Sequence, residues 1–236
     1  MSKRSDPSHV TWLGVAASLS LALVLSACAA SRQPRGTPEE SGFLGDYSEL
    51  QKGKRGEMAL VYFAPGVDWK SYNAVIFESV TLWPGPEGHL KDLSPEDQKM
   101  LADYLYTSVH DALAKVTTLT TTPGPGVLRL RVALTEAKAT HVLMNAVATV
   151  VPQIRTVTTI AGLAANTSLT VGEATIEGDV TDSVTHRRLA AFDDERIGQR
   201  SMRGLGTWSQ VDAAFDHWAE QLANRLVALQ QGQPVE

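Results

Sequence analysis

The densest group of ionisable side chains is the run Asp193-Asp194-Glu195-Arg196. Neighbouring carboxylates can coordinate a divalent cation, and two of them can act as general acid and general base in a hydrolase. The run follows the apolar residues Leu189 to Phe192, so a solvated strand end accounts for it without any chemistry. We favour the strand end. Asp193, Asp194 and Glu195 remain candidate metal ligands or, together with a histidine, candidate catalytic groups of a hydrolase.

The other residues that can do chemistry form no known motif. The histidines lack the H-x-x-x-H and H-E-x-x-H spacings of metal sites, and the chain has neither a P-loop nor a G-x-S-x-G elbow. Asp68-Trp69 and Trp83 could form an aromatic platform for a sugar, although such tryptophans more often anchor packing. The sequence thus indicates no metal site and no cofactor, and it favours a protein that is not an enzyme. The histidines beyond the N-terminal segment are His89, His110, His141, His186 and His217.

The single cysteine, Cys28, ends a segment with the layout of a secretory signal. Lys3 and Arg4 give a basic start, and Trp12 to Leu25 form a charge-free stretch of about 14 residues. A bilayer span needs about 20 apolar residues, so this stretch is short for a transmembrane helix.

Leu25-Ser26-Ala27-Cys28 resembles the lipobox of bacterial lipoproteins at all four positions. The resemblance implies that residues 1–27 are removed and that Cys28 is lipidated on its thiol and on its new amino group. The lipid on Cys28 would then bind the protein to a membrane, because two or three acyl chains hold a protein stably. The alternative is an ordinary signal peptide in which the cysteine is coincidental.

The segment after the lipidation site has two prolines and no large apolar residue. We therefore expect residues 28–40 to comprise the lipidated cysteine and a flexible tether. Ala29 is not the aspartate associated with retention in the inner membrane. In a host with two membranes, this places the protein on the inner leaflet of the outer membrane, facing the periplasm.

The remainder of the chain is long enough for one domain, which we place at residues 41–231. The net charge of the whole sequence is −5. Nucleic-acid binding depends on clustered lysine and arginine, so a mildly acidic chain is evidence against it.

Hydrophobic periodicity predicts the elements of this domain. Strands are expected at 58–63, 74–80, 127–134, 173–180 and 189–192, with a hairpin turn at 182–188. Helices are expected after the N-cap Ser94 and after a capping box at Thr207. Leu128, Leu130, Val132 and Leu134 should point inward, and Glu173, Thr175, Glu177 and Asp179 outward. The order of these strands and helices along the chain predicts an α+β fold with a mostly antiparallel sheet and two amphipathic helices packed on one face.

Residues 139–170 are unusually apolar. No charge occurs from Val142 to Ile154, and none follows Arg155 until Glu173. Pro152 and the many threonines and glycines are evidence against one transmembrane helix. We favour an insertion that packs on the same domain. A surface that meets lipid or protein, or a pair of membrane-crossing strands, are the alternatives.

Several segments together resemble a bacterial lipoprotein family of unknown function, DUF3313. They are S-G-F-L-x-D-Y at 41–47, Y-F-x-P-G-V-D-W-x-x-Y-x-x-V-I-F-E-x-V at 62–80, Asp182-Ser183-x-Thr185, Leu189 to Ala191, and Trp208 to Leu226. The resemblance covers about residues 41–230 and implies a lipoprotein location, without an activity or catalytic residues. Where the family often has Thr-Gly at the hairpin, this chain has Thr185-His186.

The function favoured by these observations is a non-enzymatic scaffold or modulator of envelope protein complexes, acting as a homo-oligomer or with an envelope partner. The first alternative is a carrier of lipid or another small ligand that uses the apolar residues 139–170. The second alternative is the hydrolase described above.

Overall fold

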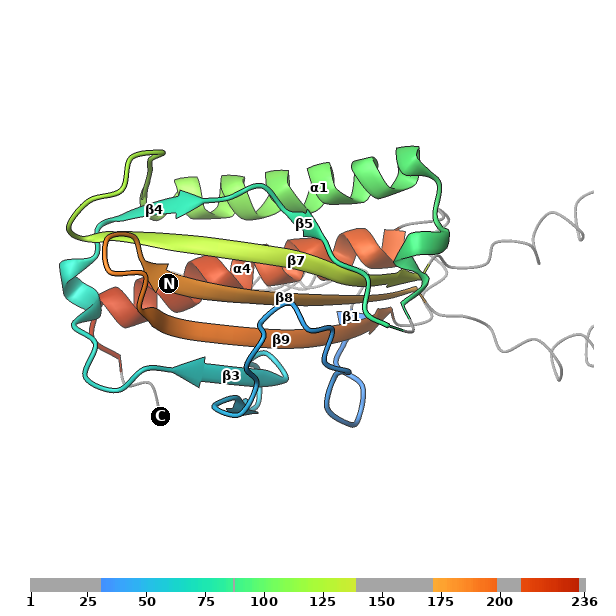
Figure 1. Ribbon diagram of the computed structural model, residues 1–236, viewed down its shortest axis with the longest axis horizontal. Helices are drawn as coiled ribbons and strands as arrows, with labels where there is room; N and C mark the ends of the chain where they lie inside the picture. The colour runs from blue at the N-terminus through green and yellow to red at the C-terminus, as the bar shows by residue number, and fades with distance from the viewer. Residues whose placement is uncertain (1–30, 87, 139–171, 199–208, 234–236) are drawn as a thin grey trace, which may run out of the picture.

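The computed structural model describes residues 31–86, 88–138, 172–198 and 209–233. Its frame is a set of three long antiparallel strands, β7 (Val127–Lys138), β8 (Glu173–Asp182) and β9 (Arg188–Gly198) (Figure 1). Shorter strands extend the sheet on both sides: β2 (Gln51–Lys52) and β3 (Leu60–Phe63) beyond β9, and β4 (Ala74–Phe77) and β6 (Thr118–Leu119) beyond β7. Two more strands lie off this path, since β1 (Ser31–Arg32) pairs with β9 and β5 (Thr81–Leu82) pairs with β7.

The fold is α+β with a mostly antiparallel sheet, as the sequence predicted, but the sheet also contains parallel pairs. Strand β4 runs parallel to β6 and β7, and β5 runs parallel to β7. Parallel neighbours need a crossover connection. Helix α1 (Pro95–Ala114) supplies it, because it lies in the chain between β5 and β6. Two short 3-10 helices, η1 (Trp69–Ser71) and η2 (His89–Asp92), complete the connections.

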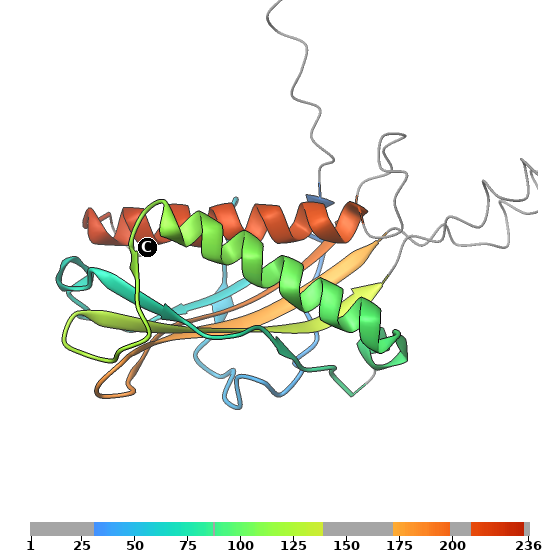
Figure 2. The same cartoon turned by 90° about the horizontal axis from the view of Figure 1, so that it is seen from above.

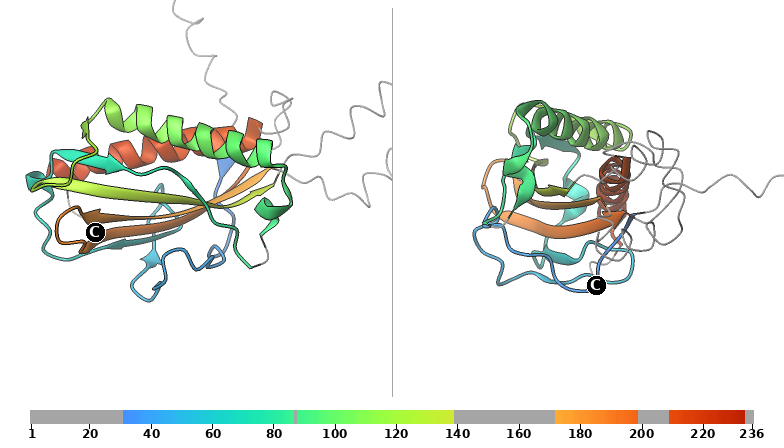
Figure 3. Two further views of the ribbon diagram at one scale, coloured as in Figure 1. Left: turned by 45° about the horizontal axis from the view of Figure 1, so that its top comes forward. Right: turned by 90° about the vertical axis from the view of Figure 1, so that its right-hand side faces the viewer.

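Helices α1 and α4 (Ser209–Gln230) lie together over one face of the sheet (Figures 2 and 3). Helix α1 begins as predicted, because the Ser94 hydroxyl accepts a 3.1 Å hydrogen bond from the backbone N–H of Asp97. Each helix buries one apolar face. In α1 the buried residues are Leu101, Leu105, Val109 and Leu113, and in α4 they include Val211, Phe215, Trp218, Leu226 and Leu229. Leu222 of α4 is only partly buried and packs against this core.

The face of the sheet opposite the helices is also covered. On the helix side, Leu128, Leu130, Val132 and Leu134 are buried in the core as predicted. On the opposite face, polar residues of β8 that were predicted to point outward are shielded from solvent: Glu177 is 0% and Asp179 is 2% exposed. Ser41 N–H and the Tyr47 hydroxyl both donate to Glu177. The segment that begins at Ser41 therefore lies over this face and shields it.

The sequence predicted a flexible tether up to residue 40, but the chain is already paired with the sheet at Ser31. Residues Ser31 and Arg32 form β1 and pair with Gly198 and Ile197 of β9. The Gln33 side-chain amide donates to the backbone oxygen of Glu57 at 2.7 Å and also to Asp194. A strand edge offers unpaired backbone groups, so even a polar segment gains partners by joining it.

Several predictions concern residues outside the described parts of the chain. They are the signal peptide at 1–27, the lipidated Cys28, the apolar insertion at 139–170 and the capping box at Thr207. Within the described residues, no helix has both the length and the apolar character that a membrane span requires.

Candidate functional site

The acidic run Asp193 to Arg196 is not a solvated strand end. It lies within β9, and its members alternate between the two faces of the sheet because side chains in a strand alternate. Asp193 and Asp194 are both fully buried, and Arg196 is 7% exposed. The sequence reading failed because the apolar residues before the run suggested that the strand ended there.

Asp194 faces the helices and is fully engaged in hydrogen bonds. Its carboxylate accepts from the indole N–H of Trp218 at 2.6 Å and from the backbone N–H of Ala59 at 2.7 Å. It also accepts from Gln33 and, at 3.3 Å, from Nε of Arg196. A carboxylate with its lone pairs used in this way ties four segments together and is not placed to act as a base or nucleophile.

Asp193 faces the opposite side, and neither of its carboxylate oxygens has a hydrogen-bond partner among the described residues. It is paired across the strands with Glu177 of β8. Burial, followed by the nearby charge of Glu177, raises the pKa of Asp193 to about 8. Glu177 in turn holds the Tyr47 hydroxyl, and burial together with that bond raises the pKa of Tyr47 to about 12. Asp193 is therefore a buried neutral acid at neutral pH.

Glu195 does not assemble a metal or catalytic site with these residues. Burial and the charge of Glu173 raise its pKa, while Lys138 opposes the rise. Among the described residues, no group of three histidine, cysteine, aspartate or glutamate side chains is arranged to hold a metal ion. No hydrogen bond joins a described histidine to Asp193, Asp194 or Glu195, so the geometry offers no acid–base pair for the hydrolase hypothesis.

The histidines and tryptophans singled out from the sequence are also dispersed. His89 lies 3.2 Å from Glu136, His110 lies 3.0 Å from Asp111, and His217 has its pKa lowered, mainly by burial. His186 occupies the β8–β9 turn. His141 is outside the described residues.

The two tryptophans do not share a platform. Trp69 is buried between Phe63 and Tyr72, with ring centroids at 6.4 and 6.3 Å. Trp83 is 43% exposed and packs edge-on against Phe43.

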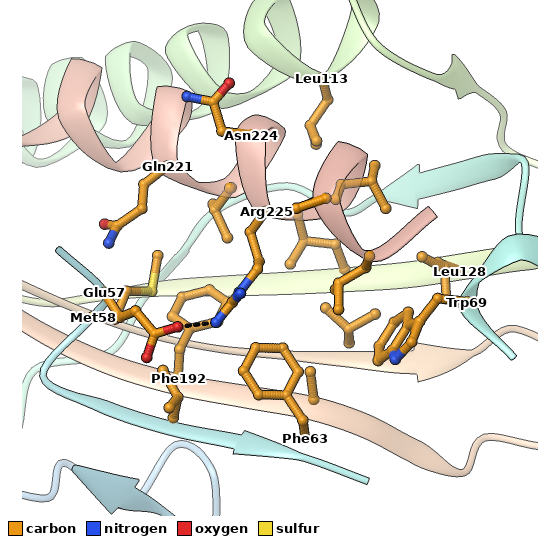
Figure 4. Close-up of a pocket in the computed structure, with 18 of the residues that line it drawn as sticks. Glu57, Met58, Phe63, Trp69, Leu113, Leu128, Phe192, Gln221, Asn224 and Arg225 are labelled. Carbon is orange, nitrogen blue, oxygen red and sulfur yellow. Dashed lines mark hydrogen bonds and ion pairs between the residues drawn. The ribbon is translucent and has the colours of Figure 1, made fainter. Parts of the chain in front are cut away.

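A mainly apolar cavity of about 520 Å³ lies between the C-terminal half of α4 and the sheet (Figure 4). Its walls are mainly apolar. They include Met58, Phe63, Trp69, Leu128, Phe192 and Leu226. Ala190 on β9 and Ala228 on α4 also line it. Their short side chains leave space between helix and sheet that larger residues would fill.

Polar residues form one edge of the cavity. Arg225 of α4 makes an ion pair with Glu57, which lies in the turn between β2 and β3 (Figure 4). The guanidinium also lies 4.9 Å from the centre of the Phe63 ring. One turn earlier on α4, the Gln221 side chain donates a 2.9 Å hydrogen bond to the backbone oxygen of Gly56. These contacts join the turn to the helix across the edge of the cavity.

Sequence reasoning missed this cavity. The carrier hypothesis was assigned to residues 139–170, whereas the lining residues come from α4, from the turn before β3, from α1 and η1, and from β3, β4, β7, β8 and β9. The only local signal was the placement of Gln221 and Arg225, four residues apart, beside the apolar face of α4. That spacing also fits an ordinary boundary between buried and exposed residues.

Comparison with known proteins identifies relatives without a known activity. The uncharacterized lipoprotein YdcL of Escherichia coli (strain K12) is 28% identical over 177 residues, covering 70% of this chain and 73% of that protein. Among solved structures, the PelC dodecamer from Paraburkholderia phytofirmans aligns with a TM-score of 0.37 and 8% identity, over 68% of this chain and 93% of that chain. A protein from Xanthomonas campestris aligns with a TM-score of 0.35 and 15% identity, over 72% of this chain and 91% of that chain.

The family comparison agrees with the resemblance found in the sequence motifs. A family model described as "Protein of unknown function (DUF3313)" matches residues 39–222, which is most of the sequence. The chain belongs to the DUF3313 family.

Proposed function

We propose that this protein is a membrane-anchored lipoprotein that binds an apolar ligand in the cavity beneath α4. The observation that carries the proposal is the apolar cavity of about 520 Å³. Ligand sites in proteins usually measure about 300–1,000 Å³ and are lined mostly by apolar and aromatic side chains. The cavity fits this description, and its polar groups are confined to one edge.

The free energy available from such a cavity is sufficient for useful affinity. Burying a methylene contributes about 0.8 kcal/mol, so eight methylenes would contribute about 6 kcal/mol before the costs of ordering. A micromolar dissociation constant corresponds to about 8 kcal/mol. Eight methylenes alone therefore support binding weaker than micromolar, toward the millimolar range, and a longer chain or additional contacts would be needed for a micromolar dissociation constant.

The charge at the edge favours a ligand with an uncharged body. Arg225 is already neutralised by Glu57. An anionic head group would have to displace Glu57 to reach the guanidinium, and a cationic one would have to displace Arg225. We expect neither charge to add much to binding.

The proposed anchor is the lipid on Cys28. Its support is the four-residue lipobox match and the similarity to YdcL, which carries the name of a lipoprotein. Protein extracted from host membranes should begin at Cys28 and carry the mass of the added acyl chains. Cys28→Ser should lack the mass of the acyl chains and should remain as the unprocessed precursor. The inner leaflet of the outer membrane is the proposed location, and membrane fractionation tests it.

The ligand proposal is tested with N-phenyl-1-naphthylamine, whose fluorescence rises in an apolar site. Ala228→Trp should fill the cavity and remove the saturable fluorescence. Asp111→Trp adds the same side chain to a 64% exposed position on α1 and should leave it unchanged. Absence of saturable binding to the wild-type protein, or equal binding by both variants, would reject the cavity as a ligand site. Native mass spectrometry of gently extracted protein would then identify any natural ligand.

A scaffold for envelope proteins is the second candidate, and one surface feature favours it. The exposed Trp83 packs against Phe43, and the guanidinium of Arg131 lies 5.3 Å from the centre of the Phe43 ring. Tryptophan and arginine are enriched at protein–protein contacts. A photo-crosslinking residue at position 83 should trap a reproducible partner or a second copy in intact cells, whereas the same residue at exposed Lys99 should not.

A further inference from the structure

We infer that the end of the sheet at which β1 lies is held against the membrane surface, and that the β8–β9 turn points away from it. This orientation rests on the proposed lipid anchor at Cys28 but goes beyond it. An anchor on a long flexible tether would leave the domain free to tumble, whereas an anchor close to a fixed strand does not.

The first step is that the chain is already fixed to the domain at Ser31. Ser31 and Arg32 pair with β9 through the backbone. The side chain of Arg196 adds hydrogen bonds to the carbonyl oxygen and hydroxyl of Ser31, at 3.4 and 3.3 Å. Gln33 adds bonds to Glu57 and Asp194. Residues 31–33, the N-terminal arm, are thus held by backbone pairing with β9 and by hydrogen bonds of the Gln33, Asp194 and Arg196 side chains, which are partly or fully buried.

The second step is the reach of the remaining chain. Cys28 precedes Ser31 by three residues. Three peptide units span at most about 11 Å, even fully extended. The twelve residues of β7 extend over about 40 Å at 3.3 Å per residue. The anchor is therefore much shorter than the domain, and the edge at Ser31 must lie within about 11 Å of the lipidated residue.

The third step identifies what else lies at this end. The pairing register places Lys138 beside Glu173, Glu173 beside Ile197, and Ser31 beside Gly198. The last residues of β7 and β9, the first of β8, and β1 therefore share one end of the sheet, which faces the viewer in the right-hand panel of Figure 3. The β8–β9 turn is at the other end, about 30 Å away along β8.

The described lysine at this end of the sheet is already neutralised by carboxylates. Lys138 is paired with Glu173 at 2.7 Å, and Glu136 and Glu195 lie nearby. A basic patch would make membrane contact sensitive to salt and to anionic lipid. Here the contact follows from the short anchor, so the orientation should persist at high salt and on vesicles without anionic lipid.

The test uses the acylated full-length protein on vesicles that carry nickel-chelating lipids. Acylation consumes the only native thiol, so a nitroxide can be attached to one introduced cysteine. His89→Cys and Val184→Cys form a matched pair. The His89 side chain is 60% exposed and lies near the proposed membrane end beside Glu136. Val184 is 53% exposed and lies in the β8–β9 turn. Nickel on the head groups enhances spin relaxation only at short range, so we expect several-fold enhancement at position 89 and none above the nickel-free background at position 184.

Two controls separate the possible failures. Protein that does not float with vesicles would refute the lipid anchor itself, while leaving the ligand cavity to its own test. Protein that floats but shows equal or reversed relaxation at the two positions would refute the orientation alone. A 20-residue Gly/Ser spacer between Ala30 and Ser31 has a root-mean-square length of about 25 Å and should abolish the contrast. A contrast that survives the spacer would overturn the short anchor as its cause.

Discussion

The indole N–H of Trp218 in α4 donates a 2.6 Å hydrogen bond to the buried carboxylate of Asp194 in β9. The other partners of Asp194 come from the N-terminal arm, from the backbone beside β3 and from β9 itself. A single carboxylate thus joins the helix layer, the sheet and the segment that leads to the proposed anchor. Its neighbour Asp193 points to the other face, where no described residue forms a hydrogen bond with its carboxylate. These two adjacent residues therefore have opposite energetic roles.

Asp194→Asn should destabilise the domain strongly. The substitution removes the charge that pairs with the buried Arg196 and replaces one acceptor with a donor facing other donors. Breaking a buried ion pair by changing one partner typically costs about 3–5 kcal/mol. Urea unfolding followed by circular dichroism measures the loss. The β1 arm should also become more accessible to protease, because the charged acceptor of one of the two Gln33 hydrogen bonds is lost. A change smaller than about 1 kcal/mol would contradict the role assigned to Asp194.

Asp193→Asn should stabilise the domain, but only above acidic pH. The pKa of Asp193 is raised to about 8 in the folded protein, whereas an unfolded aspartate titrates near 3.9. Below about pH 4 both states are protonated, so burial of Asp193 carries no ionisation cost. As the pH rises toward 8, only the unfolded chain gains from ionisation, and wild-type stability falls by up to about 5 kcal/mol.

The free energy of unfolding of wild type and Asp193→Asn, measured from pH 4 to 9, checks this linkage. The variant keeps a buried polar amide, so we expect a gain of roughly 1–3 kcal/mol at pH 8 and little or none at pH 4. Taking the difference between the two proteins cancels the titration of other groups. A difference that does not change with pH would contradict the raised pKa of Asp193.

His186→Gly should stabilise the protein. His186 has a positive φ of 58°, and its N–H donates a 2.9 Å hydrogen bond to the backbone oxygen of Asp182. A side chain in this left-handed region is strained by about 1 kcal/mol, which glycine avoids. Glycine also loses more backbone entropy on folding, so we expect a net gain of about 0.5 kcal/mol. Thermal unfolding measures it, with Val184→Gly in the same turn as a control that should not gain stability.

Glu57→Gln should open the edge of the cavity without harming the fold. Glu57 and Arg225 are 21% and 29% exposed, and partly solvated pairs of this kind contribute about 1 kcal/mol or less. The pair nonetheless joins the turn to α4 over one side of the cavity. We expect a bound fluorescent probe to dissociate several-fold faster, as measured by stopped flow. Asp103→Asn breaks the exposed pair with Lys99 on α1 and should leave the dissociation rate unchanged.

Local features of the sequence were sufficient for α1 and for most of β7. The Ser94 cap and the four-residue spacing of Leu101, Leu105, Val109 and Leu113 predicted α1, because capping and helical periodicity depend only on near neighbours. Alternation from Val127 to Leu134 predicted β7 for the same reason. Family membership was also readable, since it depends on the order of residue types.

The environment of the polar residues was decided only by tertiary structure. Alternation shows that Glu177 and Asp179 share a face of β8, but it does not show whether another segment covers that face. Tyr47, which lies 130 residues from Glu177 in sequence, supplies the cover. The partners of Asp194 come from comparable distances, 161 residues for Gln33 and 135 for Ala59. The cavity has the same origin, because it exists only where α4 meets β3 and β9. Burial and cavities depend on which distant segments meet, and no periodicity within one segment encodes that.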